Sequence, residues 1–159
     1  MNIMLKKLAV LGTIIVMSVM MTGCGSKNVE GKLSDLMDKL YVNFNEDELP
    51  MALTQIEVTE ENVEYYLGSK EIEFKEALAS ESMTGSVAYS VVLVRTKEGA
   101  DVEKVKKQIK ENVDPRKWIC VGVEDEDVVI ENKGDLIIVI IVDNPDHVSK
   151  LQKEFRNLK

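Results

Sequence analysis

Cys24, Cys120 and His147 carry the most reactive side chains of this chain, and they lie far apart in the sequence. Nucleophilic catalysis needs a serine or cysteine brought to a base such as histidine, and no known motif for such a pair is present. A structural zinc site needs about four Cys or His ligands, which this chain does not have. We therefore expect neither an enzyme nor a metal site.

Cys120 and His147 are expected to be structural residues. Cys120 lies in the apolar string WICV, which predicts a buried, unpaired side chain that packs as a small hydrophobe rather than a redox or catalytic thiol. His147 follows Asp146 at the start of an expected helix, where a solvated side chain is predicted. An envelope hydrolase would instead require a Ser, Thr or Cys within hydrogen-bond reach of His147.

The sequence before Cys24 is typical of a bacterial lipoprotein signal peptide. Residues 1–23 contain no acid, Lys6 and Lys7 form a positive start, and Leu8 to Met21 is a 14-residue apolar run. A membrane-spanning helix needs about 20 apolar residues, so a run of this length suits a signal-peptide core. The run ends in Met21-Thr22-Gly23-Cys24, which resembles the lipobox with methionine where leucine is usual.

We predict cleavage between Gly23 and Cys24 and a covalent lipid on the Cys24 thiol, with no other cofactor. Each lipid CH₂ that enters the bilayer contributes about 0.8 kcal/mol, so several acyl chains would hold the protein at a membrane. An ordinary secretory signal with an incidental cysteine, or an uncleaved N-terminal anchor, is the alternative. The predicted division is a signal peptide (1–23), a lipidated tether (24–31) and one domain of unknown function (32–159).

Composition restricts the classes of protein that this chain can belong to. It has 159 residues, is 45% hydrophobic and has a formal net charge of −8, which becomes −10 when residues 1–23 and their two lysines are removed. The apolar share excludes a disordered chain, and the excess of acid argues against nucleic acid as a partner, because phosphates need a basic face. An anionic lipid surface would repel such a domain, so the lipid should hold it there.

Two acidic segments imitate calcium ligands. Residues 124–127 (EDED) are too short to wrap an ion. Residues 43–47 (NFNED) begin like a calcium loop, but Glu48 replaces its obligatory glycine and Thr54 replaces its bidentate glutamate. Both segments are expected to be solvated loops, with weak binding of millimolar extracellular calcium as the alternative.

The string Asp114-Pro115-Arg116-Lys117-Trp118 contains the only tryptophan. Arginine and tryptophan are enriched at binding hot spots, so Arg116 and Trp118 are candidate interaction residues. A lone tryptophan also serves as core filler, and Asp-Pro ends a helix. An exposed Trp118 would favour the interaction site, and a buried one would remove it.

Periodicity predicts an α+β domain. Apolar spacing and capping residues indicate helices at 33–41, 60–67 and 101–112, and a last helix that opens at Asn144-Pro145. Strands are expected over 70–79, 87–94, 128–130 and 136–142, and 119–123 could be a short strand or an extended connection.

From residue 70 the expected order is ββαββα, and a weak internal repeat relates its two halves. The second strand of each half is apolar on both faces, so both should be central, and the more polar first strands should be edges. This predicts a four-stranded antiparallel sheet in the order 1-2-4-3 with both helices on one face, a permuted ferredoxin-like arrangement. The second face of 136–142 then needs cover from the N-terminal helices or from a partner.

Several of these segments together resemble a known family. The lipobox before Cys24, the helix end at 65–68 (YYLG), the segment 97–107, the string DPRKWICVGV at 114–123 and the turn at 132–135 (NKGD) look like the family called domain of unknown function four-three-five-eight. That family consists largely of predicted lipoproteins of Gram-positive bacteria. The resemblance implies an anchor on the outer face of the cytoplasmic membrane, and it implies no activity.

These patterns together predict a membrane-anchored, extracytoplasmic lipoprotein that acts as a protein-interaction module on an unknown envelope protein. The alternative is an extracytoplasmic ligand- or ion-binding protein, which a well-formed apolar pocket with convergent polar groups would favour. An envelope hydrolase has the least support.

Overall fold

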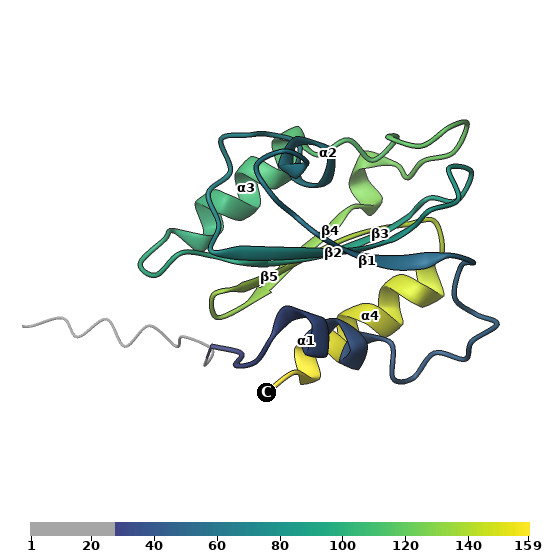
Figure 1. Ribbon diagram of the computed structural model, residues 1–159, viewed down its shortest axis with the longest axis horizontal. Coiled ribbons are helices and arrows are strands. Elements are labelled where there is room, and N and C mark those ends of the chain that lie inside the picture. The colour runs from purple at the N-terminus through teal and green to yellow at the C-terminus, as the bar shows by residue number, and fades with distance from the viewer. Residues whose placement is uncertain (1–27) are drawn as a thin grey trace, which may run out of the picture.

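The computed structural model describes residues 28–159, so the predicted signal peptide, the cleavage site and Cys24 lie outside the described residues. One antiparallel sheet forms the middle layer, and helices cover both of its faces (Figure 1). This is the α+β class that the periodicity predicted. Within residues 28–159, no helix is long and apolar enough to cross a membrane.

The sheet has five strands in the order β1-β2-β3-β5-β4, so the prediction of four strands in a ferredoxin-like arrangement is not confirmed. The four expected strands do follow the expected antiparallel order, as β2-β3-β5-β4, and β1 is added beside β2. The strands are β1 (Leu53–Glu57), β2 (Glu76–Ser82), β3 (Tyr89–Arg95), β4 (Val129–Lys133) and β5 (Leu136–Val142). Every neighbouring pair is antiparallel, and the register pairs Tyr89 with Val142 and Arg95 with Leu136 at the two ends of the central pair.

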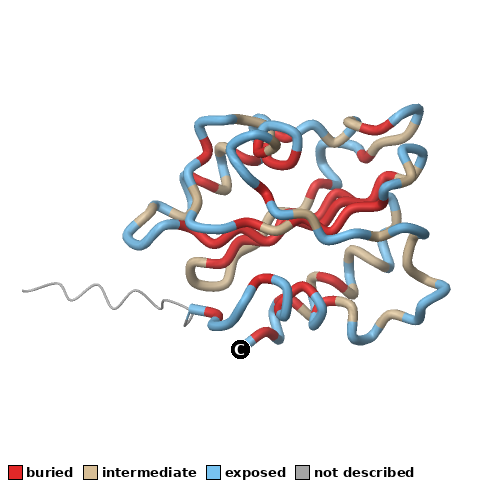
Figure 2. Tube along the Cα trace, viewed as in Figure 1, coloured by how far each residue is buried: buried red, intermediate tan, exposed pale blue. Residues whose placement is uncertain are grey.

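The central strands are β3 and β5, as their two-sided apolar patterns indicated. All seven residues of each strand are buried, and they form the red band through the middle of Figure 2. Alternate side chains point to opposite faces of a strand. Val92, Val94 and Val139 therefore join one hydrophobic cluster, while Leu93 and Ile138 join a second cluster on the other face.

The fifth strand, β1, was not predicted because its sequence carries a weak pattern. Only Leu53 and Ile56 of LTQIE are partly buried, as in a strand at the edge of a sheet. β1 pairs with β2, so β2 is an inner strand rather than the expected edge. β2 also begins at Glu76 instead of residue 70, and 119–123 is not a strand.

Four α-helices and one short 3₁₀ helix accompany these strands. They are α1 (Leu33–Leu40), α2 (Val63–Leu67), α3 (Val102–Asn112), η1 (Asp125–Asp127) and α4 (Pro145–Asn157). Side chains cap the two longest helices. Asp101 accepts a hydrogen bond from the Lys104 amide, and Asn144 accepts from the Asp146 and His147 amides. Such caps pair backbone donors that a helix start leaves free.

The helices lie on opposite faces, so the prediction of α3 and α4 on one face is wrong. α2 and α3 pack on one face of the sheet, and α1 and α4 pack on the other (Figure 1). α3 joins β3 to the parallel strand β4, and crossover connections of this kind are nearly always right-handed. No strand follows α4, so this rule does not determine which face of the sheet α4 covers. Leu151 and Phe155 of α4, with Leu36 of α1, cover the second face of β5.

Gly68 ends α2 in a conformation that only glycine adopts easily. Its φ is +90°, and a Cβ at this position would lie 2.2 Å from the Asn112 carbonyl carbon and 2.3 Å from the Val113 nitrogen. The absence of a side chain therefore lets the end of α2 approach the end of α3. This contact fixes the two helices against each other on one face of the sheet.

We expect Gly68→Ala to lower the free energy of unfolding by more than the roughly 1–3 kcal/mol of backbone strain alone, because the new methyl group also meets the Asn112 backbone. Urea unfolding of the purified protein measures the loss. Gly99→Ala is the matched control, since Gly99 has a φ of +75° but nothing within 4 Å of an added Cβ. Equal losses for the two variants would contradict the close approach.

Candidate functional site

A buried carboxylate, Glu81 of β2, organises one end of the sheet. It accepts hydrogen bonds from the Tyr65 hydroxyl at 2.7 Å and from Trp118 Nε1 at 3.1 Å, and it pairs with Lys117 Nζ at 2.8 Å. The side chains of Lys117 and Glu81 are each only 4% exposed. A buried charge is tolerated only when it is paired and hydrogen-bonded, and Glu81 meets both conditions.

Aromatic rings surround the ammonium group of Lys117. Nζ lies 4.2 Å from the centre of the Tyr65 ring, 4.7 Å from that of Tyr66 and 5.1 Å from that of Trp118. It also donates to the Ser90 hydroxyl at 3.3 Å. The faces of aromatic rings attract cations, so these rings replace part of the water that the ammonium group loses. We call Glu81, Lys117, Trp118, Tyr65 and Tyr66 the Glu81 clasp.

The Glu81 clasp is closed to substrates in this conformation. Burial lowers the pKa of Lys117, while the neighbouring Glu81 charge raises it. A lysine with a lowered pKa can act as a nucleophile, but the Lys117 amine is enclosed by rings and by Glu81. What the geometry does is attach the segment after α3, which carries Lys117 and Trp118, to β2 and α2.

Burial and the Glu81 charge also raise the pKa of the two clasp tyrosines. The pKa of Tyr66 rises to about 12 through burial and the nearby Glu81 carboxylate. Burial and the hydrogen bond to Glu81 raise the pKa of Tyr65. On the other face of the sheet, burial raises the pKa of Tyr41 to about 12, and burial raises the pKa of Tyr89 as well.

The structure separates the two predicted interaction residues, Arg116 and Trp118. Trp118 is 8% exposed and is part of the clasp, so the condition set for an interaction site there, an exposed indole, is not met. Arg116 is exposed and forms an ion pair with Glu124. The alternative prediction, that the lone tryptophan is core filler, is the one that the structure confirms for Trp118.

The residues after Trp118 point outward. Ile119 is 74% exposed, and Cys120 is exposed, so the expectation of a buried Cys120 is wrong. The physical reason is the backbone. Cys120 has a φ of +62°, in the left-handed region, and this breaks the alternation that a strand would need. The Ile119 amide donates to the Gly85 carbonyl at 2.9 Å, which holds the segment in place.

His147 is in the first turn of α4, as expected, but its side chain is half-buried rather than fully solvated. It packs edge-on against Phe44, with ring centres 5.3 Å apart, and against Tyr89 at 6.0 Å. Burial lowers its pKa. Among the described residues, no hydroxyl or thiol is hydrogen-bonded to the ring, and Nδ1 is buried without a partner. The aromatic contacts indicate a packing role.

Side chains of the two acidic segments form hydrogen bonds and ion pairs with other residues of the domain. Asn43 donates to Glu154 at 2.8 Å, and Glu48 accepts from the Asn45 amide and from Lys150. The 124–127 segment contains η1. Within residues 28–159, no group of three or more His, Cys, Asp or Glu side chains is placed to hold a metal ion.

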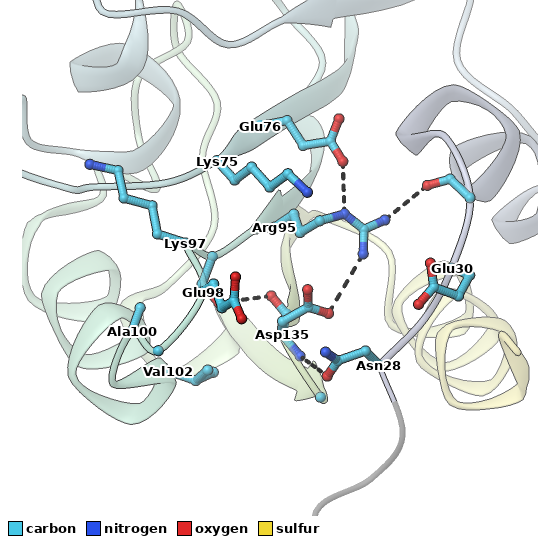
Figure 3. Close-up of a pocket in the computed structure, with 14 residues that line it drawn as sticks. Asn28, Glu30, Lys75, Glu76, Arg95, Lys97, Glu98, Ala100, Val102 and Asp135 are labelled. Atoms are coloured by element: carbon cyan, nitrogen blue, oxygen red, sulfur yellow. Dashed lines mark hydrogen bonds and ion pairs between the residues drawn. The ribbon is translucent and has the colours of Figure 1, made fainter.

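A second buried charge, Arg95 at the end of β3, holds the N-terminal segment. Its guanidinium donates to the Val29 carbonyl at 2.6 Å and to the Gly31 carbonyl at 2.9 Å. It also pairs with Glu76 at 2.7 Å and with Asp135 at 3.6 Å (Figure 3). Because the five donors of arginine lie in one plane, this one side chain can join the segment to β2 and to the turn between β4 and β5.

Residues from Asn28 onward are therefore docked on the domain, which corrects the predicted tether of 24–31 at its C-terminal half. Val29 is 1% exposed, and the Asn28 side chain accepts from the Asp135 amide at 3.3 Å. The sequence suggested a flexible tether because GSKNVEG is polar, but a single valine and the carbonyls that Arg95 binds are enough to fix it.

A polar cavity of about 550 Å³ opens beside Arg95 (Figure 3). Charged side chains of both signs line it, including Lys75, Lys97, Glu30 and Glu98. Arg95 itself is occupied by carbonyls and carboxylates of the same chain. The cavity is thus unlike the apolar pocket that would favour a ligand-binding protein.

Sequence reasoning missed Glu81, Lys117 and Arg95, the residues that organise both ends of the sheet. Two weak patterns could have indicated them. Glu81 is a lone acid within the strand sequence ALASES, and Arg95 directly follows the apolar run VVLV. An ionisable residue that continues a buried strand needs a partner, but the identity of that partner depends on tertiary contacts.

Lys117→Met should lower the free energy of unfolding by about 3–5 kcal/mol, because it leaves the Glu81 carboxylate buried without a cation. Adding Glu81→Gln should restore much of the loss, since glutamine keeps an acceptor for Tyr65 and Trp118. Urea unfolding followed by the fluorescence of Trp118, the only tryptophan, measures both. The control Arg116→Ala removes an exposed ion pair and should cost at most about 1 kcal/mol. A Lys117→Met loss no larger than that control contradicts the clasp.

A pH titration tests the four tyrosines together. Their pKa values all lie above 10 in the folded protein, with Tyr41 and Tyr66 at about 12. Phenolate absorbance should therefore stay low at pH 10 and appear near pH 10 in urea. Because the unfolded chain loses these protons first, stability should fall as the pH rises above 10. Half-ionised tyrosine in the folded protein at pH 10 would contradict the raised pKa values.

Comparison with known proteins finds no significant match to any family model, curated protein or solved structure. The resemblance to the domain of unknown function four-three-five-eight family therefore stays a prediction. The two buried-charge sites, at Glu81 and at Arg95, are the structural features that bear on function.

Proposed function

We propose that this chain is a lipid-anchored extracytoplasmic lipoprotein whose domain acts as a protein-interaction module. The docked N-terminal segment is the observation that carries the proposal. Only residues 25–27 separate Cys24 from Asn28. Four residue steps reach about 14 Å at most, so a lipid on Cys24 would keep the Arg95 end of the domain close to the bilayer.

The docking of residues 28–31 determines how a lipid on Cys24 would hold the domain. A flexible leader would leave the domain free to turn, whereas Arg95 binds the Val29 and Gly31 carbonyls and makes this segment part of the folded domain. A short connection between a lipid and a rigid domain limits how far the domain can move from the membrane. The location proposed is the outer face of the cytoplasmic membrane, on the family resemblance.

An interaction module is preferred to ligand binding because the buried polar groups are already used. Glu81 and Arg95 are bonded to groups of the same chain at both ends of the sheet. The cavity beside Arg95 lacks the apolar lining expected of a ligand-binding protein, and its mixed charge would suit only a polar, zwitterionic small molecule. Interaction surfaces, in contrast, are solvent-facing side chains held by a rigid scaffold.

Cys24→Ala should release the protein from membranes and abolish incorporation of a radiolabelled fatty acid. The reason is that the thiol is the proposed attachment atom. Membrane fractionation and detergent-phase partitioning of cells measure the release. Cys120→Ala is the matched control, because Cys120 is an exposed cysteine of the folded domain and should leave both readouts unchanged. Unchanged labelling and partitioning of Cys24→Ala would refute the anchor.

A further inference from the structure

Three of the large exposed apolar side chains lie at one end of the sheet. Met51 is 84% exposed, Met83 is 64% exposed and Ile119 is 74% exposed. The Met83 amide donates to the Ala52 carbonyl at 3.1 Å, which brings the end of β2 beside the start of β1. The Ile119 amide bonds the Gly85 carbonyl, two residues after Met83. We call Met51, Met83 and Ile119 the distal tip.

The distal tip is at the opposite end of the strands from the docked N-terminus. The register pairs Leu53 with Ser82 near the tip, whereas Glu76 pairs with Arg95 at the other end of β2. Figure 1 shows the N-terminal segment at the left and the connection between β2 and β3 at the right. A seven-residue strand spans about 20 Å, so the tip is about that far from the Arg95 end.

The Glu81 clasp holds Ile119 in its exposed position. Lys117 and Trp118 are fixed inward by Glu81, and the chain then turns at Cys120, whose φ is +62°. An apolar side chain held on a rigid segment loses little further freedom on binding, which favours affinity. The same rigidity explains why a hydrophobic side chain can stay exposed, because it has no route to the core.

Acidic groups lie at the same end of the sheet as the distal tip, and we call them its acidic rim. Glu124 pairs with Arg116 on the segment that carries Ile119. Glu124, Glu126, Asp127 and Asp143 line one hollow of about 430 Å³ between the 122–129 segment and the start of α4. Like the rest of a chain with net charge −8, this side would attract a basic surface and repel an acidic one.

We infer that the distal tip is the docking surface for an envelope protein whose contact region has apolar side chains flanked by lysine or arginine. The inference rests on the proposed lipid anchor, since the anchor determines which end of the domain faces away from the bilayer. Apolar side chains at the centre and charges at the rim are the usual anatomy of a protein interface. Exposed apolar groups rimmed by polar residues mark such sites.

The anchor geometry argues against two other occupants. The bilayer that holds the lipid is at the Arg95 end, about a strand length from the tip, and the acidic rim would repel anionic headgroups. Two copies anchored in one membrane would stand side by side, so their tips would point the same way instead of meeting. A second protein, with charge opposite to the rim, is the occupant that fits.

Site-specific photocrosslinking on intact cells tests the docking surface with the full-length chain. A benzophenone amino acid replaces Ile119 or Met83 in turn, and the crosslinked peptide is sequenced by mass spectrometry. Val42 is the matched control, because it is 70% exposed but directly follows α1, one of the two helices that cover the face of the sheet with Leu93 and Ile138. We expect both tip positions to capture the same protein through a peptide with apolar and basic residues, at least tenfold more than Val42 does.

A second substitution and a change of salt concentration test the apolar and the charged contacts separately. With the probe at Met83, Ile119→Lys should reduce the adduct at least tenfold, and high salt should reduce it as well. Lipid adducts, peptides of this chain itself, equal capture at Val42 or no adduct at either tip position would each overturn the docking surface. Membrane fractionation of the same cells tests the anchor independently, so a protein that stays with the membrane without crosslinking keeps the proposed anchor and loses this surface.

Discussion

The constraint on which the rest of the structure depends is the burial of both faces of β3 and β5. Every residue of these two strands is buried, and such strands are stable only between two covering layers. The chain therefore needs helices above and below the sheet. α2 and α3 supply one layer through residues such as Ile109, and α1 and α4 supply the other through residues such as Phe155. The three-layer arrangement is a consequence of two apolar strands.

Buried charges complete this hydrophobic framework at its two ends. Glu81 fixes the segment after α3, and Arg95 fixes the segment before α1, so each attaches an irregular stretch of chain to the sheet. The same two residues define the functional geometry that we propose. Arg95 lies at the end from which the chain continues toward Cys24, and the Glu81 clasp holds Ile119 in solvent at the opposite end. The proposed anchor and the proposed docking surface are thus separated by the length of the strands.

Local patterns predicted the regular elements well and the irregular ones poorly. The α3 and α4 helices were expected from their spacing and caps, and β5 was expected over its observed length, because a helix or a central strand repeats its pattern over many residues. β1 was missed, since an edge strand with two partly buried residues has almost no pattern. Cys120 was placed in the core because WICV is apolar, yet a left-handed residue within that string directs it outward. The candidate site shows the same contrast, because Trp118 was singled out from the sequence while Glu81, which accepts its indole hydrogen bond, was not.

By itself, the sequence determined the α+β class and the two central strands, and it predicts a lipid on Cys24, because each of these depends on residues that are neighbours in the chain. Only the tertiary structure decided which faces the helices cover, which side chains neutralise Glu81 and Arg95, and which apolar residues remain in solvent. The physical reason is distance along the chain. Glu81 and Lys117 are 36 residues apart, and Arg95 and Val29 are 66 apart. The partner of a buried charge is set by the packing of elements that no local pattern specifies.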